Sequence, residues 1–316
     1  MLNIFTLENG RLVGIQPDEI AVRKPIWVDV IAPGDGEREW VGKAFSLILP
    51  QPEHLRDIEA SARFYEEEGR LHLRSDFLLG KESDSRSVIV AFVLSDNVLF
   101  SMHDEDTPVF QHFRLHSHGQ PDLVADSLDV LVDLYGSDVE FSADALEEAY
   151  ADLGEISDTV LNNTLSDKQA GAVLANIAHA EHLNGRIRRN LMDTRRAVSF
   201  LMRSKLLAPE QFEEARQIMQ DIDSLDGHTA FLFDKINFLM NTTVGFINVN
   251  QNKIVRLFSV VSVALLPPTL IASIYGMNFR HMPELHWPNG YLFALLLMVL
   301  SVAVPFAIFY RKGWLK

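Results

Sequence analysis

The stretch SIYGMNFRHMPELHW, residues 273–287, places a Tyr-Gly-Met-Asn turn, two histidines and a Met-Pro-Glu-Leu sequence between two long apolar runs. The carboxamide of Asn278 is a neutral oxygen acceptor just after the first run. The C-terminus of a helix carries a partial negative charge of roughly half an elementary unit, so an acceptor at this place suits a cation. Almost any polar linker would close a hairpin, and these residues therefore need a chemical explanation.

Polar side chains recur along the first apolar run and its approach at spacings of three and four residues. This heptad pattern places them on one face of a helix. Two explanations fit the pattern, because small polar residues allow helices to pack closely in lipid and also line water. The pattern alone does not decide between them, and a water-filled path would require several chains. The residues of this polar stripe are Asn252, Val255, Ser259, Ser262, Leu266, Thr269 and Ser273.

The two runs have the length that a membrane requires. Leu257 to Ile274 has eighteen residues without a charge, and Tyr291 to Tyr310 has twenty. At about 1.5 Å of rise per residue, each can cross a hydrocarbon core of roughly 30 Å, the first one only with help from its flanks. The sequence therefore predicts two transmembrane helices joined by a short loop.

Basic residues flank the two runs on one side only. Lys253 and Arg256 precede the first run, and three more basic residues follow the second, whereas Arg280 in the loop is balanced by Glu284. Basic flanks tend to stay in the cytoplasm, so both termini are predicted to be cytoplasmic and the loop to face outward. The N-terminal sequence MLNIFTLENG has no basic region followed by an apolar core, and it predicts no secretory signal.

The composition limits the classes of function. The formal net charge is −15, from 28 Lys and Arg against 43 Asp and Glu, and the acidity lies mostly before the hairpin. Such a charge disfavours nucleic acid as a partner and favours cations, although it also serves solubility. The absence of cysteine excludes disulfides and thiolate metal sites. No G-x-x-x-x-G-K-[ST] loop, nucleophile or acid–base pair points to an enzyme or to ATP-driven transport.

The elements that would position the stripe fall into two kinds. Over the first hundred residues, short β-rich runs alternate with polar turns such as Asn9-Gly10 and Ser95-Asp96-Asn97, which is typical of hairpins. Two stretches at 37–49 and 52–64 have helical spacing. After Asp106 the strand signals stop and amphipathic helical patterns follow. From Pro209 to Pro267 the helical pattern continues past two glycines, which predicts one helix running from the cytoplasmic part into the membrane.

The predicted fold class is an α+β cytoplasmic domain, with a mixed sheet and flanking helices, followed by stalk helices and two C-terminal transmembrane helices. The predicted boundaries are 1–120 for the α/β domain, 121–250 for the helical stalk, 251–279 for the first transmembrane helix, 280–290 for the loop, 291–310 for the second transmembrane helix and 311–316 for a basic tail.

The turn and the loop resemble a known family. Tyr-Gly-Met-Asn-Phe at 275–279 resembles the Gly-Met-Asn signature that ends the first transmembrane helix of the CorA family of magnesium channels, and Met-Pro-Glu-Leu at 282–285 resembles the loop motif that follows it. The stretches DIEASARF at 57–64 and FSVVSVALLPPTLIASIYGMNF at 258–279 are similar to CorA proteins of the enterobacterial type. The resemblance covers essentially the whole chain.

The resemblance implies a homopentamer in the bacterial inner membrane, with the α/β domains forming a cytoplasmic funnel and the first membrane helices lining one pore. It assigns the polar stripe to the pore lining, and Gly276, Met277 and Asn278 to a selectivity filter at the outer mouth. Asn278 would contact hydrated Mg²⁺ through its water shell, and Glu284 would attract cations at the loop. Mg²⁺ is the implied transported and regulatory ion, with Co²⁺ and Ni²⁺ as further cargo, and the partners are the lipid bilayer and other copies of the chain, not nucleic acid.

Two other functions compete with a magnesium channel. Zinc transporters of the ZntB type carry Gly-Ile-Asn in the signature, so Met277 favours the magnesium branch. A membrane-anchored cation sensor would use the hairpin only as an anchor. An anchor has no need for the hydrogen-bond acceptors of the polar stripe.

Regulation by intracellular Mg²⁺ is predicted at acidic residues of the long helix. Mg²⁺ held between subunits would keep apolar rings of Val255 and Leu266 closed, because apolar constrictions gate by dewetting. No family motif assigns the ligands, and the candidates are Asp221, Asp223, Asp226 and Asp234.

Overall fold

The computed structural model describes residues 1–50, 63–80, 86–162, 166–278 and 282–312, which divide into two compact units. The first unit comprises Met1–Thr164 and Gly171–Met240, and the second comprises Leu165–Ala170 and Asn241–Lys316.

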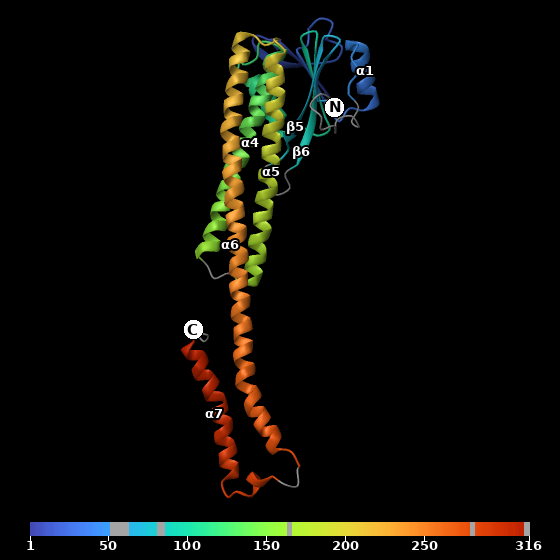
Figure 1. Ribbon diagram of the computed structural model, residues 1–316. Coiled ribbons are helices and arrows are strands. Elements are labelled where there is room, and N and C mark those ends of the chain that lie inside the picture. Colours follow the sequence, from blue (N-terminus) through green and yellow to red (C-terminus); the bar gives the residue numbers. More distant parts are fainter. Residues whose placement is uncertain (51–62, 81–85, 163–165, 279–281, 313–316) are drawn as a thin grey trace. The chain divides into compact units, whose positions relative to one another are not determined.

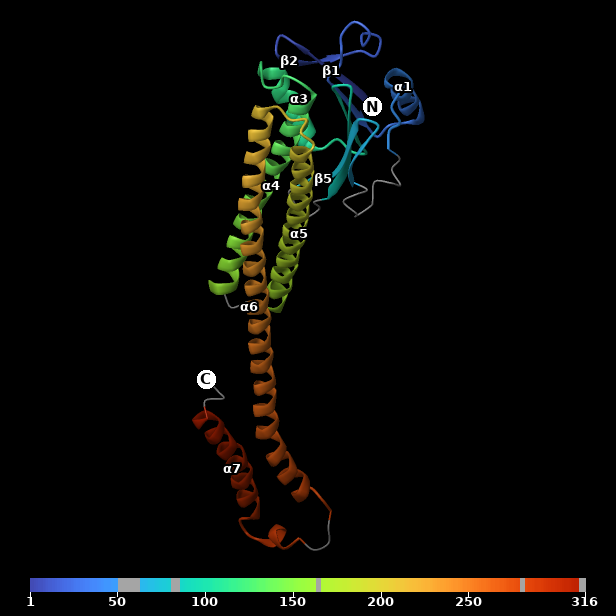
Figure 2. The same ribbon diagram turned by 45° about the horizontal axis from the view of Figure 1, so that its top comes forward.

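The first unit contains a seven-stranded mixed sheet, whose strand order is β2-β1-β3-β7-β6-β5-β4 (Figures 1 and 2). Strands β3 and β7 pair in parallel, and every other neighbouring pair is antiparallel. The strands are β1 (Leu2–Glu8), β2 (Arg11–Ile15), β3 (Trp27–Ile31), β4 (Phe64–Glu67), β5 (Arg70–Leu78), β6 (Ser87–Ser95) and β7 (Val98–His103).

Two-residue turns close three hairpins of the sheet. Asn9-Gly10, Glu68-Gly69 and Asp96-Asn97 join β1 to β2, β4 to β5 and β6 to β7, and all six residues have positive φ. Positive φ at both central residues defines the type I′ turn, whose twist matches that of the paired strands. The hairpins at Asn9-Gly10 and Asp96-Asn97 confirm the prediction. The strand β4 was not predicted, because helical spacing over 52–64 was extended to Phe64, and residues 51–62 lie outside the described part.

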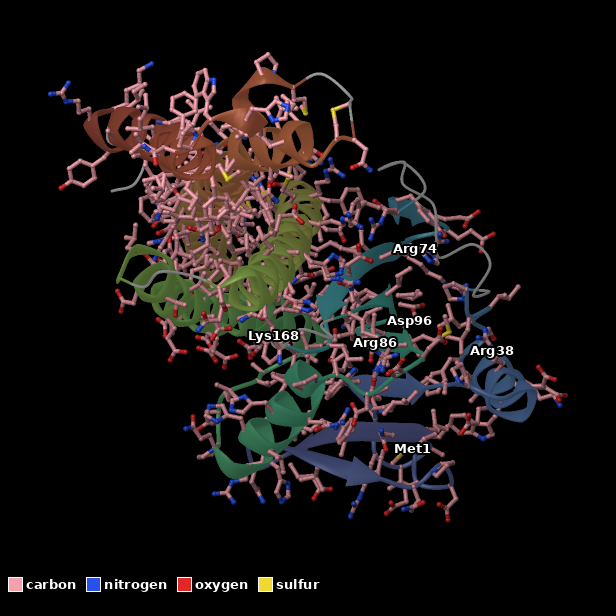
Figure 3. All side chains as sticks on the ribbon, turned by 90° about the horizontal axis from the view of Figure 1, so that it is seen from below. Met1, Arg38, Arg74, Arg86, Asp96 and Lys168 are labelled. Atoms are coloured by element: carbon pink, nitrogen blue, oxygen red, sulfur yellow. The ribbon has the colours of Figure 1, made fainter. Side chains whose placement is uncertain are left out.

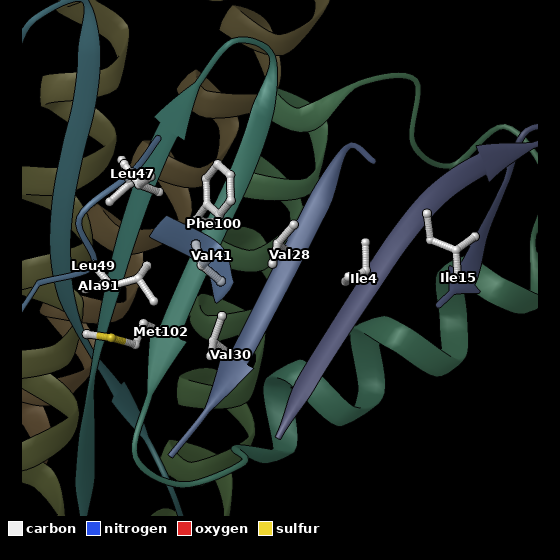
Figure 4. Close-up of a cluster of buried hydrophobic side chains, with 11 residues drawn as sticks. Ile4, Ile15, Val28, Val30, Val41, Leu47, Leu49, Ala91, Phe100 and Met102 are labelled. Carbon is white, nitrogen blue, oxygen red and sulfur yellow. The ribbon is translucent and has the colours of Figure 1, made fainter. Parts of the chain in front are cut away.

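One face of the sheet packs against α1 (Asp35–Phe45), which supplies Val41 to a buried cluster (Figure 4). The helix is shorter than the predicted 37–49, because Ser46 takes the left-handed conformation that ends it. Leu47 and Leu49, beyond the helix end, still contribute to the same cluster.

The opposite face carries α3 (Pro108–Gly119) and α4 (Ser127–Asn162) over an aromatic core of Trp27, Phe92 and Phe110. Helix α3 was not predicted, although Thr107 accepts a hydrogen bond from the Phe110 amide and Pro108 starts the helix. A threonine cap followed by proline at the first helical position is a start signal that could have revealed it.

A buried ionic network fixes α3 on the sheet. The Asp29 carboxylate, which is inaccessible to solvent, accepts hydrogen bonds from Ser101 Oγ at 2.7 Å and from Arg114 Nη1 of α3 at 2.8 Å. It also lies 2.9 Å from His103 Nε2. Burial lowers the pKa of His103, but the hydrogen bond and the charge of Asp29 outweigh burial, so the net direction is upward. A buried charge of this kind is stable only because it is paired and hydrogen-bonded.

Helix α4 packs beside α5 (Asp167–Arg203) and the N-terminal part of α6 (Pro209–Tyr275) in the first unit (Figure 1). A second buried network joins α4 to α5, where Asn190 Nδ2 donates to both oxygens of Asp138 at 3.0 and 2.9 Å and Thr194 Oγ1 donates at 2.9 Å. Burial raises the pKa of Asp138 to about 7, against the lowering effect of these donors. Among the described residues, the buried Asn190 Oδ1 has no hydrogen-bond partner.

The second unit contains the two apolar spans. The helix α6 is continuous over 67 residues and runs through Pro267 and Pro268, so it is about 100 Å long at 1.5 Å per residue. The 3₁₀-helix η2 (Pro283–His286) and α7 (Gly290–Arg311) follow. Both α6 and α7 are long and apolar enough to cross a membrane, and few residues of their apolar windows are buried. The mixed sheet, the long helices and these two apolar helices confirm the predicted fold class.

Candidate functional site

The turn that ends α6 holds the three residues of the predicted filter. The amide of Gly276 donates to the Ala272 carbonyl at 2.9 Å, and the amide of Met277 donates to the Ile274 carbonyl at 3.2 Å. The helix therefore closes at the position that the Gly-Met-Asn signature predicts. Carbonyls of the last turn that lack an intrahelical partner leave a negative helix end beside Asn278.

Gly276 is required for close approach rather than for an unusual backbone angle. Its φ lies outside the left-handed region, but a Cβ added there would lie 3.1 Å from the Ala272 carbonyl oxygen and 3.6 Å from that of Ser273. The first distance is shorter than ordinary van der Waals contact. A larger residue would therefore require the turn or the Ala272 carbonyl to move by a few tenths of an ångström.

Met277 and Asn278 both project into open surroundings, and the side chain of Met277 is 47% exposed. The next residues, 279–281, lie outside the described part of the chain. Glu284 falls within η2, but its side chain is not among those described, so the predicted attraction of cations by Glu284 stays a prediction.

All seven residues of the polar stripe are exposed along α6. The buried residues of this part of the helix, Val260 and Ala264, lie on another face. At 100° per residue the centre of the stripe is roughly 150° around the axis from these two residues. The stripe is therefore turned away from the side of the helix that is already covered.

Two hydroxyl groups of the stripe bond to their own helix. Ser259 Oγ donates to the Val255 carbonyl at 2.8 Å, and Thr269 Oγ1 donates to the Leu265 carbonyl at 2.6 Å. Each hydroxyl has one donor and two acceptor lone pairs, so a hydroxyl whose proton is engaged presents acceptors outward. Such a surface can accept hydrogen bonds from the hydration waters of a cation, and it is less suited to an anion.

Two apolar members interrupt the polar groups of the stripe. Val255 and Leu266 share its face and are 63% and 67% exposed. Leu266 directly precedes Pro267 and Pro268, which remove two backbone donors from the helix ladder at that level.

The four predicted regulatory aspartates do not form one cluster. Asp223 pairs with Arg195 at 2.9 Å and Asp226 pairs with Arg188 at 3.2 Å, both across to α5. Asp221 accepts from Gln217 at 3.0 Å and, by helical spacing, lies on another face than the other three. Within the described residues there is no group of three or more histidine or carboxylate side chains that could hold a metal ion. A regulatory site built from these residues would need ligands from a second chain, as the prediction assumes.

A basic cluster on α5 was missed by the sequence analysis. Five arginines lie between Arg186 and Arg196, and most of them line a pocket against β5 and β6. The run GRIRRNLMDTRR, in a chain of net charge −15, is the signal that could have found it.

A mixed α/β domain is joined by one continuous helix to a hairpin of apolar helices, and a stripe of polar residues ends in a Gly-Met-Asn turn. This order of elements is typical of a membrane protein. Residues 23–311 match the family model of the CorA-like Mg²⁺ transporter protein, and the chain belongs to this family.

Relatives match over the full length of the chain. It is 43% identical over 316 residues to the magnesium transport protein CorA of Haemophilus influenzae, covering 100% of both chains. It is 42% identical over 317 residues to that of Sodalis glossinidius, again covering 100% of both. The solved structure of the CorA magnesium transporter from Methanocaldococcus jannaschii has the same fold, with a TM-score of 0.81 and 20% identity over 99% of this chain and 98% of that chain. The predicted family is confirmed.

Proposed function

We propose that the protein is a passive channel that admits hydrated Mg²⁺ to the cytoplasm. Five copies place the polar stripes of their α6 helices around one pore, and Gly276, Met277 and Asn278 form a ring at its outer mouth. The observation that carries the proposal is the exposed stripe of oxygen acceptors, which lies away from the covered face of α6 and leads to Asn278 at the helix end.

The chemistry of this ring suits an ion that keeps its water. Mg²⁺ demands octahedral oxygen coordination and dehydrates reluctantly. Neutral carboxamides and backbone carbonyls accept hydrogen bonds from its first-shell waters without displacing them. Binding by neutral acceptors also stays weak enough for release, which conduction requires.

The membrane potential supplies the driving force. With both termini in the cytoplasm and the loop outside the inner membrane, entry follows an inside-negative potential. A divalent ion gains about 4.6 kcal/mol per 100 mV, from roughly 2.3 per unit charge. No energy-coupling site is needed for uptake on this scale.

The test is Mg²⁺ flux into liposomes reconstituted with the wild type and with Asn278→Ala, at a fixed inside-negative potential. We expect flux in the wild type and a loss of tenfold or more in Asn278→Ala, with the oligomer intact by size-exclusion chromatography. The matched control is Asn289→Ala, since Asn289 precedes α7 and makes no side-chain cap hydrogen bond. Equal flux through both variants would place selection elsewhere than at this ring.

The same liposomes test the choice of ion. Co²⁺ and Ni²⁺ are proposed as further cargo, because both are divalent ions that carry an ordered hydration shell. Zinc uptake of the ZntB type has no support beyond the shared architecture, and Met277 at the signature position favours Mg²⁺. Zn²⁺ flux that exceeds Mg²⁺ flux would reverse this assignment.

A further inference from the structure

The arginines of α5 divide between two faces of the helix. Arg188 and Arg195 are seven residues apart and pair with Asp226 and Asp223 of α6. Arg186, Arg189 and Arg196 follow another face, at spacings of three and seven residues, over about 15 Å of helix. The first two arginines are neutralised within the unit, whereas the other three face the sheet side of α5.

A pocket of about 990 Å³ lies on that side, between α5 and the strands β5 and β6. Among the described residues, five arginines and three carboxylates line it, and Arg188 at its edge is paired with Asp226 outside the lining. The remaining charges leave a formal excess of one positive charge in a chain of net charge −15. The arginines are Arg63, Arg186, Arg188, Arg189 and Arg196.

The carboxylates of the pocket satisfy only part of this charge. Arg63 Nη2 donates to Asp193 Oδ2 at 2.8 Å and lies 3.6 Å from Asp76. Arg186 Nε donates to His182 Nε2 at 2.9 Å, which neutralises nothing. Among the described residues, Arg189 and Arg196 make no hydrogen bond or ion pair, although the charge of Arg196 acts through space on Asp193.

Two arginines elsewhere in the unit have oxygen acceptors. Arg86 pairs with Glu105 at 2.8 Å, and Arg38 donates to the Pro50 carbonyl at 3.0 Å; both are labelled in Figure 3. Within the described residues, the pocket therefore holds two guanidinium groups, those of Arg189 and Arg196, without a hydrogen-bond or ion-pair partner. It is large enough for a small molecule, since ligand pockets measure about 300–1,000 Å³.

Guanidinium groups prefer planar or tetrahedral oxyanions, which they bind through paired N–H donors. A single carboxylate would use one of Arg186, Arg189 and Arg196, whereas a chain of phosphates spans several. Ile89 and the half-exposed Met192 add apolar surface beside them. We propose that this pocket binds a small anion that carries two or more phosphate groups, of the nucleoside polyphosphate or inorganic polyphosphate kind. A long nucleic acid is disfavoured, because beyond the pocket it would meet the acidic remainder of the chain.

The test uses the full-length protein in detergent, titrated calorimetrically in Mg²⁺-free buffer with ATP, tripolyphosphate and orthophosphate. The variant Arg189→Gln/Arg196→Gln removes two free guanidinium groups from the pocket. The control Arg195→Gln/Arg216→Gln removes the same charge from α5 and α6 outside the pocket, where both arginines are exposed and paired with carboxylates.

We expect ATP, tripolyphosphate or both to bind the wild type, at least tenfold more tightly than orthophosphate. Affinity should fall tenfold or more in the pocket variant and less than threefold in the control, and it should weaken with added salt. Binding of ATP alone would identify a nucleotide as the source, and equal binding of both would identify the phosphate chain. No binding of either ligand below millimolar concentration would overturn the proposal, as would equal losses in the two variants.

Discussion

At Gly276 the proposed filter turn lies close to the end of α6. We expect Gly276→Ala to lower Mg²⁺ flux about threefold or more, because the added Cβ would lie 3.1 Å from the Ala272 carbonyl and must displace the turn by a few tenths of an ångström. For comparison, a displacement of about 1 Å in an active site lowers the rate roughly a hundredfold, so a smaller displacement should cause a smaller loss. Liposome flux and size-exclusion chromatography would measure the loss and the integrity of the oligomer.

Gly245 provides the matched control on the same helix. A Cβ at Gly245 meets nothing within 4 Å, so Gly245→Ala should leave flux unchanged and stabilise α6 by up to about 1 kcal/mol. If Gly276→Ala retained full flux, the close approach at the helix end would not be what positions Asn278.

At this scale the sequence predicted the position of the turn but not the reason for the glycine. A Gly-Met-Asn signature after an apolar run indicates where the helix ends, and the structure ends α6 at Tyr275. Whether a glycine serves a positive φ or a close contact depends on atoms of the preceding turn, which sequence spacing does not supply. The carboxamide of Asn278 is exposed, as an acceptor for hydrated ions requires, but its role stays a prediction.

The contact between α4 and α5 depends on the protonation of Asp138. This group is fully buried, and its pKa is raised from 3.8 to about 7. A raised pKa in the folded state means that the carboxyl favours folding when it is protonated. Its contribution is complete below about pH 4 and is lost as the pH rises through about 7.

Asp138→Asn should remove this pH dependence. Between pH 5 and pH 8, we expect the free energy of unfolding of the variant to rise by about 2 to 3 kcal/mol relative to the wild type. The new carboxamide at position 138 should be tolerated, because Asn190 Oδ1 has no partner among the described residues. After the Asn190 side chain flips, this oxygen can accept a hydrogen bond from the carboxamide at position 138. Chemical unfolding followed across this range gives the difference. Asp152→Asn, at an exposed position of α4, should show no trend, and a flat difference for Asp138→Asn would mean that Asp138 is ionised throughout.

Elements with strong local signals were predictable, and those without them were not. Asn9-Gly10 and Asp96-Asn97 are favoured in type I′ turns, and both hairpins were found from the sequence. The hairpin at Glu68-Gly69 has a weaker turn signal, and its first strand has only four residues, so β4 was missed. The partners of Asp138 lie 52 and 56 residues away, and no local pattern brings Asn190 and Thr194 to it.

At the scale of the whole molecule, the order of domain, long helix and hairpin follows from hydropathy and periodicity alone. The number of copies does not follow from the sequence, because a single chain shows only that the polar stripe is exposed. The arginine run of α5 is visible in the sequence, but the pocket is not, since its residues come from α5, from β5 and β6 and from Arg63 before β4, and they meet only through the fold.

The predicted regulation by cytoplasmic Mg²⁺ concerns the whole molecule, because the candidate aspartates and the proposed pore-lining stripe lie on different parts of the same helix, α6. Asp223 and Asp226 are already paired with Arg195 and Arg188. If Mg²⁺ closes the channel by binding these carboxylates, it must compete with the two arginines. Replacing the aspartate of a pair and replacing its arginine should then have opposite effects on closure by Mg²⁺.

We expect replacement of Asp221, Asp223, Asp226 and Asp234 by alanine to raise the Mg²⁺ concentration for half-closure by tenfold or more. In contrast, Arg188→Gln/Arg195→Gln should lower it about threefold, because freed carboxylates bind the ion more readily. Exposed ion pairs are worth less than about 1 kcal/mol each, so neither change should unfold the protein. Flux into liposomes loaded with graded internal Mg²⁺ measures both. Shifts in the same direction would mean that the pairs only hold α5 on α6, and an unchanged Mg²⁺ dependence in the aspartate variant would remove these residues from the regulatory site.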